Sequence, residues 1–408
     1  MIDLDALDRA DPLAKLRERF TVPEGIVYLD GNSLGCLPRA TAARVADVVE
    51  REWGEGLIRS WNQAGWIDLP RRVGDKIASL IGARAGEVVV ADSTSVNLFK
   101  LLVAAMRLNP GRPVLLTTVG NFPTDTYIAE GVADLLGAEL RRVDPDVQSV
   151  IAALDARVAV LAMTHVDYRT GRIHPLREIT AAAHAAGALT LWDLSHSAGA
   201  LELDLDPAGV DLAVGCGYKY LNGGPGAPAF AFVARRHIEG VRHPLTGWLG
   251  HAAPFAFAET YAPAAGIDRI QCGTPPLLSL LALESALEIF DGVRMSALRA
   301  KSMALGDLFI ALVDETLDGL GVTVASPRDA GIRGSQVSLT HACGYAVMQA
   351  LIANRVIGDF RAPDILRFGL APLYVRFVDV FDAVEAIARV LRTREWDRPA
   401  FLSRKAVT

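Results

Sequence analysis

Short apolar runs alternate with helical stretches through the middle of the chain, and this alternation constrains the fold more than any other feature. Most of the runs are continuously apolar, which is typical of strands buried on both faces. Stretches between them, such as Val96–Leu108, Thr124–Leu136 and Leu176–Ala186, favour crossover helices. The pattern therefore predicts an α/β fold with a mainly parallel, doubly wound sheet. The runs are Glu87–Val90, Pro113–Val119, Arg157–Met163, Ala188–Asp193, Asp211–Gly215 and Pro228–Val233.

The pattern changes after about Leu277, which divides the chain into unequal parts. A length of 408 residues suits two domains, or one large domain with an appendage. We expect a large domain at 61–290, a smaller α+β domain at 291–408, and an N-terminal segment at 1–60 that packs on the smaller domain. The elements expected outside the main sheet are a helix at Asp11–Phe20, a strand at Ile26–Leu29, helical residues Leu277–Leu317, strands at Val322–Ala325 and Gln336–Leu339, and a helix at Phe381–Leu391.

Charge and composition exclude several classes of function. The chain has 41 Lys and Arg against 47 Asp and Glu, a net charge of −6, and it has no basic block to bind nucleic acid. No apolar run approaches the roughly 18 residues that a membrane span needs, and the N-terminus lacks the apolar stretch of a signal peptide. We therefore expect a cytoplasmic protein with neither a nucleic-acid nor a membrane partner.

The cysteines and histidines show no spacing that suits a disulfide framework or a metal site. The four cysteines are far apart with no C-x-x-C pair, and the eight histidines form no His-Glu-x-x-His pattern. We therefore expect reduced thiols and no metal ion. The cysteines are Cys36, Cys216, Cys272 and Cys343.

Polar residues at three predicted strand ends have complementary chemistry. Asp193 stands where one buried strand stops, and Lys219 follows the next strand in a glycine-flanked turn. A desolvated lysine can form a Schiff base with an aldehyde, and the aldehyde cofactor pyridoxal 5'-phosphate also needs a carboxylate beside its ring nitrogen. Residues 92–97, Asp-Ser-Thr-Ser-Val-Asn, lie between a strand and a helix, where N–H groups and hydroxyls can bind a phosphate.

Each of these features has an ordinary structural explanation when it is taken alone. A serine or threonine before a helix is most often an N-cap, an aspartate at a strand end is often a cap too, and a lysine in a turn is usually solvated. Their order along the chain, with the phosphate-binding turn followed by Asp193 and then Lys219, favours a pyridoxal 5'-phosphate site.

Six motifs spread over nearly the whole chain resemble those of the pyridoxal-phosphate enzymes of the aspartate aminotransferase fold and, within that group, the kynureninases. The resemblance implies fold type I, with a large domain built on a mainly parallel seven-stranded sheet and a smaller C-terminal α+β domain. The motifs are Gly31–Gly35 (GNSLG), Phe122–Asp125 (FPTD), Asp193–His196 (DLSH), Tyr218–Gly223 (YKYLNG), Gly247–His251 (GWLGH) and Arg367–Tyr374 (RFGLAPLY).

The resemblance also implies roles in catalysis and cofactor binding. Lys219 would form the Schiff base, Asp193 would face the pyridine nitrogen, and Tyr218 is our candidate acid or base for the second half of the reaction. Trp248 and Thr274 correspond to residues that reach the phosphate from a neighbouring subunit, which implies a homodimer with composite active sites. The implied cofactor-binding residues are Thr94, Ser95, Phe122, Pro123, Thr124, Asp125, Thr164, Asp193, His196, Tyr218, Lys219, Trp248 and Thr274.

The substrate implied by the resemblance is L-kynurenine, together with 3-hydroxykynurenine, cleaved hydrolytically at its Cβ–Cγ bond in tryptophan degradation. Arg367 resembles the arginine that binds the substrate's α-carboxylate, a role that suits its planar two-donor fork. Trp61 lies where the family's substrate-facing loop runs, and Ser33 is a second candidate for lining the substrate pocket. For Trp61 and Ser33, simple packing is an equally open explanation.

Rival functions exist on the same fold and outside it. A cysteine desulfurase needs a nucleophilic cysteine on a C-terminal loop, for which Cys343 is the only candidate, and small aminotransferases share the fold. Gly31–Gly35 matches the G-x-S-x-G motif of serine hydrolases, but only one strand precedes Ser33 and no oxyanion loop is present. The sequence has no Walker or Gly-x-Gly-x-x-Gly pattern, which argues against nucleotide and nicotinamide binding.

Overall fold

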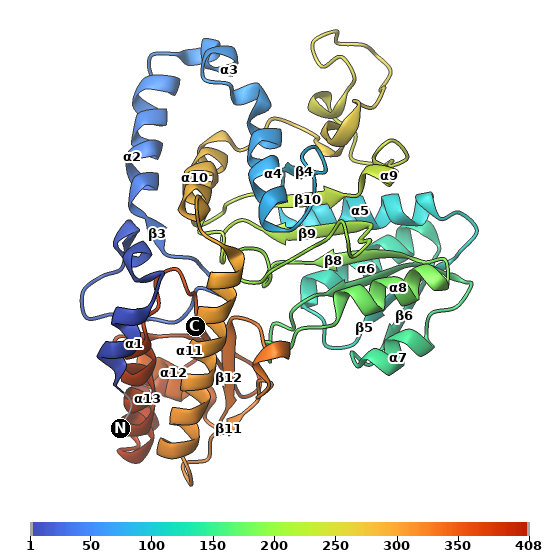
Figure 1. Cartoon of the computed structure of the whole chain (residues 1–408). Coiled ribbons are helices and arrows are strands. Elements are labelled where there is room, and N and C mark those ends of the chain that lie inside the picture. Colours follow the sequence, from blue (N-terminus) through green and yellow to red (C-terminus); the bar gives the residue numbers. More distant parts are fainter. Residues whose placement is uncertain (1–2, 406–408) are drawn as a thin grey trace.

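The computed structural model describes residues 3–405 and contains a seven-stranded sheet in the order β4-β10-β9-β8-β7-β5-β6 (Figure 1). Strand β10 runs antiparallel to both of its neighbours, and all the other pairs are parallel. The prediction of a mainly parallel, seven-stranded α/β sheet is therefore confirmed. The strands are β4 (Val88–Val90), β5 (Val114–Thr118), β6 (Glu139–Val143), β7 (Val158–Thr164), β8 (Leu189–Asp193), β9 (Leu212–Cys216) and β10 (Ala229–Val233).

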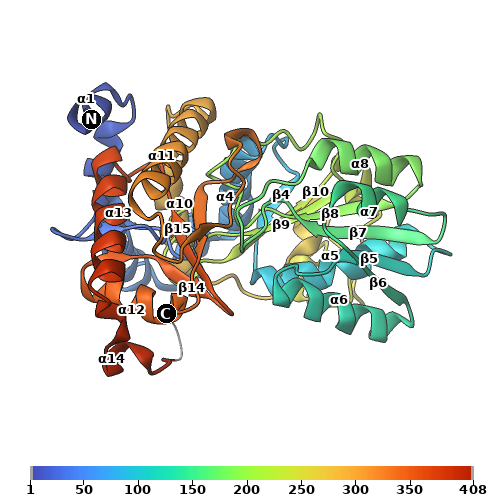
Figure 2. The ribbon, with the colours of Figure 1, turned by 90° about the horizontal axis from the view of Figure 1, so that it is seen from below.

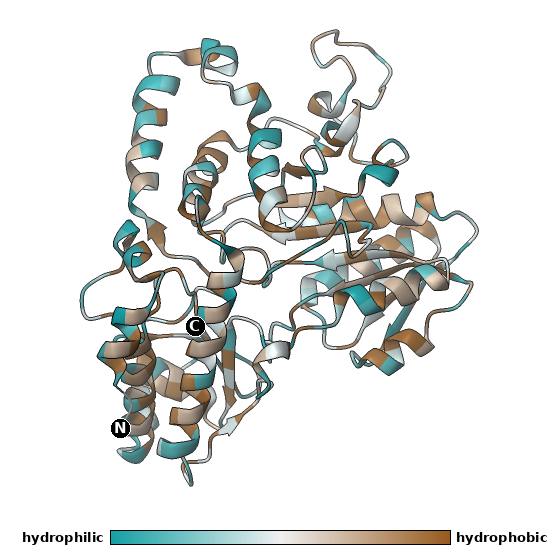
Figure 3. Cartoon of the chain, viewed as in Figure 1, coloured by the Kyte–Doolittle hydropathy of each residue, from teal (hydrophilic) through white to brown (hydrophobic). Residues whose placement is uncertain are grey.

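Two layers of helices cover this sheet, as the view from below shows (Figure 2). Apolar side chains of α5 (Thr94–Leu108) and α6 (Pro123–Leu136) pack against one face of the sheet. Helices α4 (Leu69–Leu80), α7 (Val147–Ala152) and α8 (Leu176–Ala185) cover the opposite face. The strands between these layers are mostly hydrophobic along their whole length (Figure 3), which is why the sequence shows continuous apolar runs there.

A second sheet of four antiparallel strands, in the order β11-β12-β15-β14, forms the core of the C-terminal part of the chain. Helices α11 (Met295–Thr316), α12 (Gly344–Ala353) and α13 (Phe377–Arg392) pack around it. The strands are β11 (Thr323–Val324), β12 (Gln336–Thr340), β14 (Asp359–Arg361) and β15 (Ile365–Gly369).

The first part of the N-terminal segment contacts this C-terminal part, whereas α2 (Arg39–Asp47) packs against α10 (Leu277–Leu287). Helix α1 (Leu4–Ala10) lies against α13, and strand β2 (Val27–Tyr28) pairs in parallel with β13 (Val356–Ile357). A buried ion pair, 2.7 Å between Lys301 Nζ and a carboxylate oxygen of Asp11, fixes the segment to α11. The remaining elements are β1 (Phe20–Thr21), β3 (Leu37–Pro38), α3 (Ser60–Gln63), α9 (Arg235–Ile238) and α14 (Pro399–Leu402).

Two predicted helices are corrected by the structure. Residues Leu277–Leu317 do not form one helical stretch, because α10 and α11 are separated by a turn in which Gly292 has a φ of +74°. The segment Asp11–Phe20 forms only a short 3-10 helix over Ala14–Arg19. The predicted domain boundaries, near residues 60 and 290, stay a prediction. No helix within residues 3–405 is long and apolar enough to cross a membrane.

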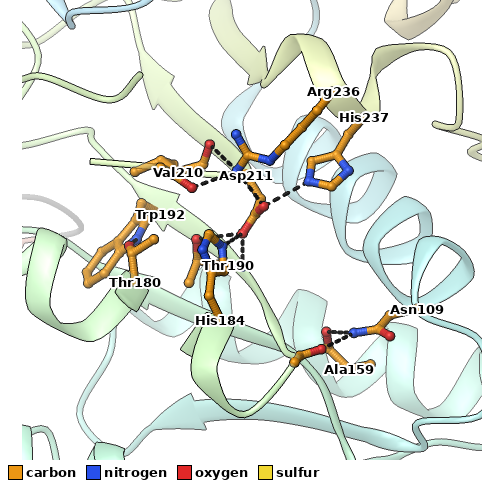
Figure 4. A network of polar contacts seen from close by, with 12 residues as sticks. Asn109, Ala159, Thr180, His184, Thr190, Trp192, Val210, Asp211, Arg236 and His237 are labelled. Carbon is orange, nitrogen blue, oxygen red and sulfur yellow. Dashed lines mark hydrogen bonds and ion pairs between the residues drawn. The ribbon is translucent and has the colours of Figure 1, made fainter. Parts of the chain in front are cut away.

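A network centred on the buried Asp211 joins α8 and α9 to the large sheet (Figure 4). Asp211 accepts a hydrogen bond from the backbone N–H of Thr190 at 2.8 Å, and its two carboxylate oxygens each lie 2.8 Å from Nε2 of a histidine, His184 or His237. Burial opposes its ionisation, but these hydrogen bonds outweigh burial and hold the pKa of Asp211 well below its usual value. Asp211 precedes β9, so this structural network lies at the opposite end of the parallel strands from Asp193.

Candidate active site

A pocket that is partly open to solvent lies at the carboxyl ends of the parallel strands. Each of five strands is followed by side chains that reach it, as expected for an open α/β sheet. Ten of the residues proposed from the sequence line this pocket, and two more, Tyr168 and Ser195, join them. The lining residues are Thr94 and Ser95 after β4, Phe122, Thr124 and Asp125 after β5, Thr164 and Tyr168 from β7 and its loop, Asp193, Ser195 and His196 from β8 and its loop, and Tyr218 and Lys219 after β9.

Lys219 faces a neutral histidine and two aromatic rings. Its Nζ lies 3.0 Å from Nε2 of His196 and 5.9 Å from the ring centroids of Phe122 and Tyr218. Burial and then the charge of Lys219 hold the pKa of His196 well below its usual value, so the imidazole is neutral at physiological pH. Among the described residues, no hydrogen-bond partner reaches the buried Nδ1 of His196.

Two buried carboxyl groups, Asp125 and Asp193, face the same pocket. The Oδ1 atom of Asp193 accepts a hydrogen bond from the backbone N–H of Ser195 at 2.8 Å. Burial and then the charge of Asp193 raise the pKa of Asp125 well above its usual value. Two carboxyl groups that face one buried pocket do not both ionise readily, so a cationic group bound beside them would be favoured.

The pocket also offers hydrogen-bond donors. Thr94 and Ser95 occupy the first turn of α5, whose N-terminal N–H groups and hydroxyls suit an anion, while the side chain of Ser93 caps the helix by accepting from the N–H of Val96. Burial raises the pKa of Tyr218, so its phenol stays protonated and can donate. The chemistry of these donors fits the phosphate of pyridoxal 5'-phosphate, and the chemistry of the two carboxyl groups fits its protonated ring nitrogen.

The proposed carboxylate-binding residue, Arg367, lies on β15 of the second sheet and is 1 % exposed. It does not line the pocket itself. Its Nη1 donates to the backbone carbonyl of Tyr168 at 2.7 Å, and Tyr168 lines the pocket with its ring 5.2 Å from that of Phe122. Ser33 accepts from Nη2 of Arg367 at 3.1 Å. The arginine and Ser33 therefore stand behind Tyr168, next to the pocket.

The other proposed site residues lie outside this pocket. Pro123 is the first residue of α6, and Thr274 is exposed. Trp61 and Trp248 pack on one another, with ring centroids 6.4 Å apart, so the structure does not place either ring in the pocket of its own chain. Their roles toward cofactor and substrate stay predictions.

Sequence reasoning missed Tyr168 and Ser195. Ser195 lies inside a motif whose ends, Asp193 and His196, were both proposed, so its neighbours were a usable signal. Tyr168 comes shortly after the end of β7, and the general rule that ligands bind beyond strand ends was the only sequence signal for it.

Comparison with solved structures identifies the fold. A cysteine desulfurase from Escherichia coli has a TM-score of 0.79 and 20% identity, covering 93% of this chain and 98% of that one. The cystine C–S lyase C-DES has a TM-score of 0.75 and 17% identity, covering 90% of this chain and 98% of the other. At such identities the likeness establishes the fold alone. Together with the site, the fold defines a pyridoxal-phosphate enzyme of fold type I.

Sequence comparison identifies the family within this class. Residues 298–387 match the model of the kynureninase C-terminal domain. A kynureninase from Burkholderia pseudomallei is 54% identical over 99% of this chain and 98% of its own. A kynureninase from Pseudomonas fluorescens is 51% identical over 100% of this chain and 99% of its own. The chain belongs to the kynureninase family.

Proposed function

We propose that this chain hydrolyses L-kynurenine, and also 3-hydroxykynurenine, at the Cβ–Cγ bond. The observation that carries the proposal is Lys219 facing neutral His196 and the Asp125–Asp193 pair, in a pocket that adjoins Arg367, within a chain of the kynureninase family. One water is consumed. The aryl carbonyl carbon gains its hydroxyl and becomes the carboxyl group of anthranilate, and Cβ gains a proton and becomes the methyl group of L-alanine.

Residues in and beside the pocket have different roles in this reaction. Bound pyridoxal 5'-phosphate supplies an electron-accepting ring that stabilises negative charge beside the substrate's amine. Lys219 Nζ removes the proton from the substrate's α-carbon, and Asp193 holds a proton at the ring nitrogen. Tyr218 keeps its phenolic proton at neutral pH, which suits proton donation in the later half of the reaction. Arg367 binds the α-carboxylate.

Cysteine desulfurase or aminotransferase activity is the alternative on this fold. Cys343 is partly buried and stands at the N-terminus of α12, where its backbone N–H donates to Nδ1 of His341. It does not line the pocket that holds Lys219. These observations favour packing over nucleophilic attack for Cys343, and the family relationship favours kynurenine hydrolysis.

The deciding experiment incubates the cofactor-loaded protein with L-kynurenine and follows anthranilate fluorescence and L-alanine formation. We expect both products in equal amounts, with Lys219→Arg inactive because a guanidinium cannot form the Schiff base. Lys15→Arg, at an exposed position of the N-terminal segment, is the matched control and should keep full activity. Sulfide release from L-cysteine without any cleavage of kynurenine would contradict the proposal and indicate cysteine desulfurase activity.

We further propose a homodimer located in the cytoplasm. Trp248 packs against Trp61 on one side and Phe255 on the other. Phe255 is 65 % exposed and Phe257 is 82 % exposed, so these residues form an exposed aromatic surface. Exposed aromatic groups of this kind favour association, and a second copy would bring Trp248 and Thr274 to a neighbouring pocket. All four cysteines are free thiols, which suits a reducing compartment.

A further inference from the structure

The guanidinium of Arg367 is held on one edge by a carboxylate. Its Nε donates to Oδ1 of Asp359 at 2.6 Å, and its Nη2 donates to Oδ2 of the same residue. Both side chains are almost completely buried. The two residues stand directly opposite one another on β15 and β14, so the antiparallel register itself fixes this two-bond contact.

The rest of the guanidinium carries weaker, replaceable contacts. Arginine has five N–H donors, of which Asp359 takes two. The backbone carbonyl of Tyr168 accepts from Nη1 at 2.7 Å, and the hydroxyl of Ser33 accepts from Nη2 at 3.1 Å. Neither acceptor is charged, so a carboxylate arriving at the terminal nitrogens would make stronger hydrogen bonds than the ones it displaces.

The charges around Arg367 favour the binding of a carboxylate to its terminal nitrogens. Arg361 also pairs with Asp359, at 2.8 Å, so two guanidinium groups share one carboxylate. The nearby Asp30 does not reliably supply a second negative charge, because burial and then the charge of Asp359 raise its pKa to about 7. At neutral pH the cluster therefore keeps a positive excess that an anionic ligand can balance.

We propose that Asp359 is a positioning residue, which holds one edge of Arg367 so that its terminal nitrogens are presented to the substrate's carboxylate. Ser33 and the carbonyl of Tyr168 occupy those nitrogens until the carboxylate replaces them. Since Tyr168 also lines the pocket and packs against Phe122, the exchange takes place beside the reacting part of the site. This inference rests on the proposed function, because it takes Arg367 as the carboxylate-binding residue.

The test measures binding of L-alanine and of L-alaninol, which lacks the carboxylate, to the cofactor-loaded protein by calorimetry. We expect the wild-type protein to prefer L-alanine by about tenfold or more, as a charge-assisted contact predicts. Asp359→Asn should lose most of that preference, and its KM for kynurenine should rise more than its kcat falls. Binding of L-alaninol should change less than about threefold, since that ligand does not use the positioned edge.

Asp314→Asn is the matched control. Asp314 also holds an arginine by two bonds, to Arg328 at 2.7 and 2.9 Å, but this pair is exposed on the protein surface. The control should keep the wild-type preference. Asp359→Glu is the second variant, because it retains the buried charge and shifts it by one methylene. It should fold and still lose part of the preference, which a purely charge-balancing role would not predict.

Three outcomes separate the possibilities. Unchanged preference in folded Asp359→Asn and Asp359→Glu overturns the positioning role. A wild-type protein that binds both ligands equally overturns the assignment of Arg367 itself, on which this inference rests. A wild-type protein that prefers L-alanine, loses this preference on Asp359→Asn and yet leaves kynurenine intact supports the positioning role while the proposed reaction fails.

Discussion

Asp125 and Asp193 show how two identical side chains at the end of one sheet take different roles. Both are buried in the pocket, and the pKa of Asp125 is raised by burial and then by the charge of Asp193. The pocket therefore favours the protonated form of Asp125. We therefore take Asp193 as the carboxylate proposed to face a cationic ring nitrogen.

This difference predicts the effect of two isosteric substitutions. Asp125→Asn replaces a protonated carboxyl group by a neutral amide and should keep kcat within about tenfold of the wild type. Asp193→Asn removes the charge and should lower kcat by about 100-fold or more. Steady-state kinetics and absorbance titration of cofactor affinity check both variants. Equal losses would show that the proton is not held on Asp125.

Asp30 predicts a pH dependence of stability. Its pKa is raised from 3.8 to about 7, by burial first and by Asp359 second, and its Oδ1 has no hydrogen-bond partner among the described residues. The folded state therefore keeps the proton over a range in which the unfolded chain has lost it, and stability falls as pH rises through this range.

The variant Asp30→Asn should not show this fall in stability with rising pH. Between pH 5 and pH 8 the free energy of unfolding of the variant should rise relative to the wild type by at least about 1 kcal/mol. Denaturant unfolding at the two pH values gives this difference directly. The exposed residue Asp134 supplies the control, since Asp134→Asn should follow the wild-type pH profile. Parallel profiles for Asp30→Asn and the wild type would contradict the prediction.

At the scale of elements, the loop Gly31–Gly35 of the N-terminal segment contacts the turn that carries Lys219. The N–H of Gly35 donates to the carbonyl of Tyr218 at 2.8 Å. A Cβ at Gly35 would lie closer than 3.0 Å to the carbonyl oxygen of Lys219 and 2.8 Å from Cα of Asn222. Glycine is needed here because backbone atoms of Lys219 and Asn222, and not only the side chain of Asn222, fill the space.

Gly35→Ala should therefore move the turn that carries Lys219. We expect a loss of about 2 kcal/mol in the free energy of unfolding and a weaker affinity for pyridoxal 5'-phosphate. Gly131→Ala is the matched control, because Gly131 lies exposed in α6 with open space around it. That control should gain about 0.5 kcal/mol from its helical position. Denaturant unfolding and cofactor titration of both variants test this prediction. A Gly35→Ala variant with unchanged stability and cofactor affinity would contradict the close contact at Gly35.

Within the large sheet, the strands predicted from the sequence are those buried on both faces, because only there does burial leave a continuous apolar run. Strand β6 was not predicted, since it lies at the sheet edge and carries charged residues, among them Glu139 and Arg141, which pair at 3.2 Å. The turn between α10 and α11 was missed because apolar residues on both sides of Gly292 continue a helical pattern. Strand β6 leaves no apolar run in the sequence, whereas the dipeptide Asp291-Gly292 was a local turn signal that the interpretation passed over.

At the scale of the whole molecule, the candidate site combines residues that follow strand ends with contacts that only the tertiary structure creates. Asp193 and Lys219 could be proposed because each follows its own strand. The pairing of Asp359 with Arg367 could not, since it depends on the register of β14 against β15. The same holds for the contact of Tyr168 with Arg367, which joins the two sheets across 199 residues of sequence.

The aromatic surface around Trp248 leads to the last prediction, which concerns the assembly. If each active site takes Lys219 from one subunit and Trp248 from the other, Lys219→Ala and Trp248→Ala should each be inactive or nearly so. After the two variants exchange subunits, a mixed dimer has one site with both residues intact. Random pairing should then restore roughly a quarter of wild-type activity, since half of the dimers are mixed and each has one working site.

Tyr218→Phe mixed with Lys219→Ala is the control for this experiment. Both residues line the pocket of one chain, so every site of a mixed dimer keeps one defect and no activity should return. Recovery in the first mixture alone establishes a composite site, because only residues contributed by different subunits can complement one another. Recovery in neither mixture, or a monomer by light scattering at assay concentration, would place Trp248 outside the active site and leave the aromatic surface without a catalytic role.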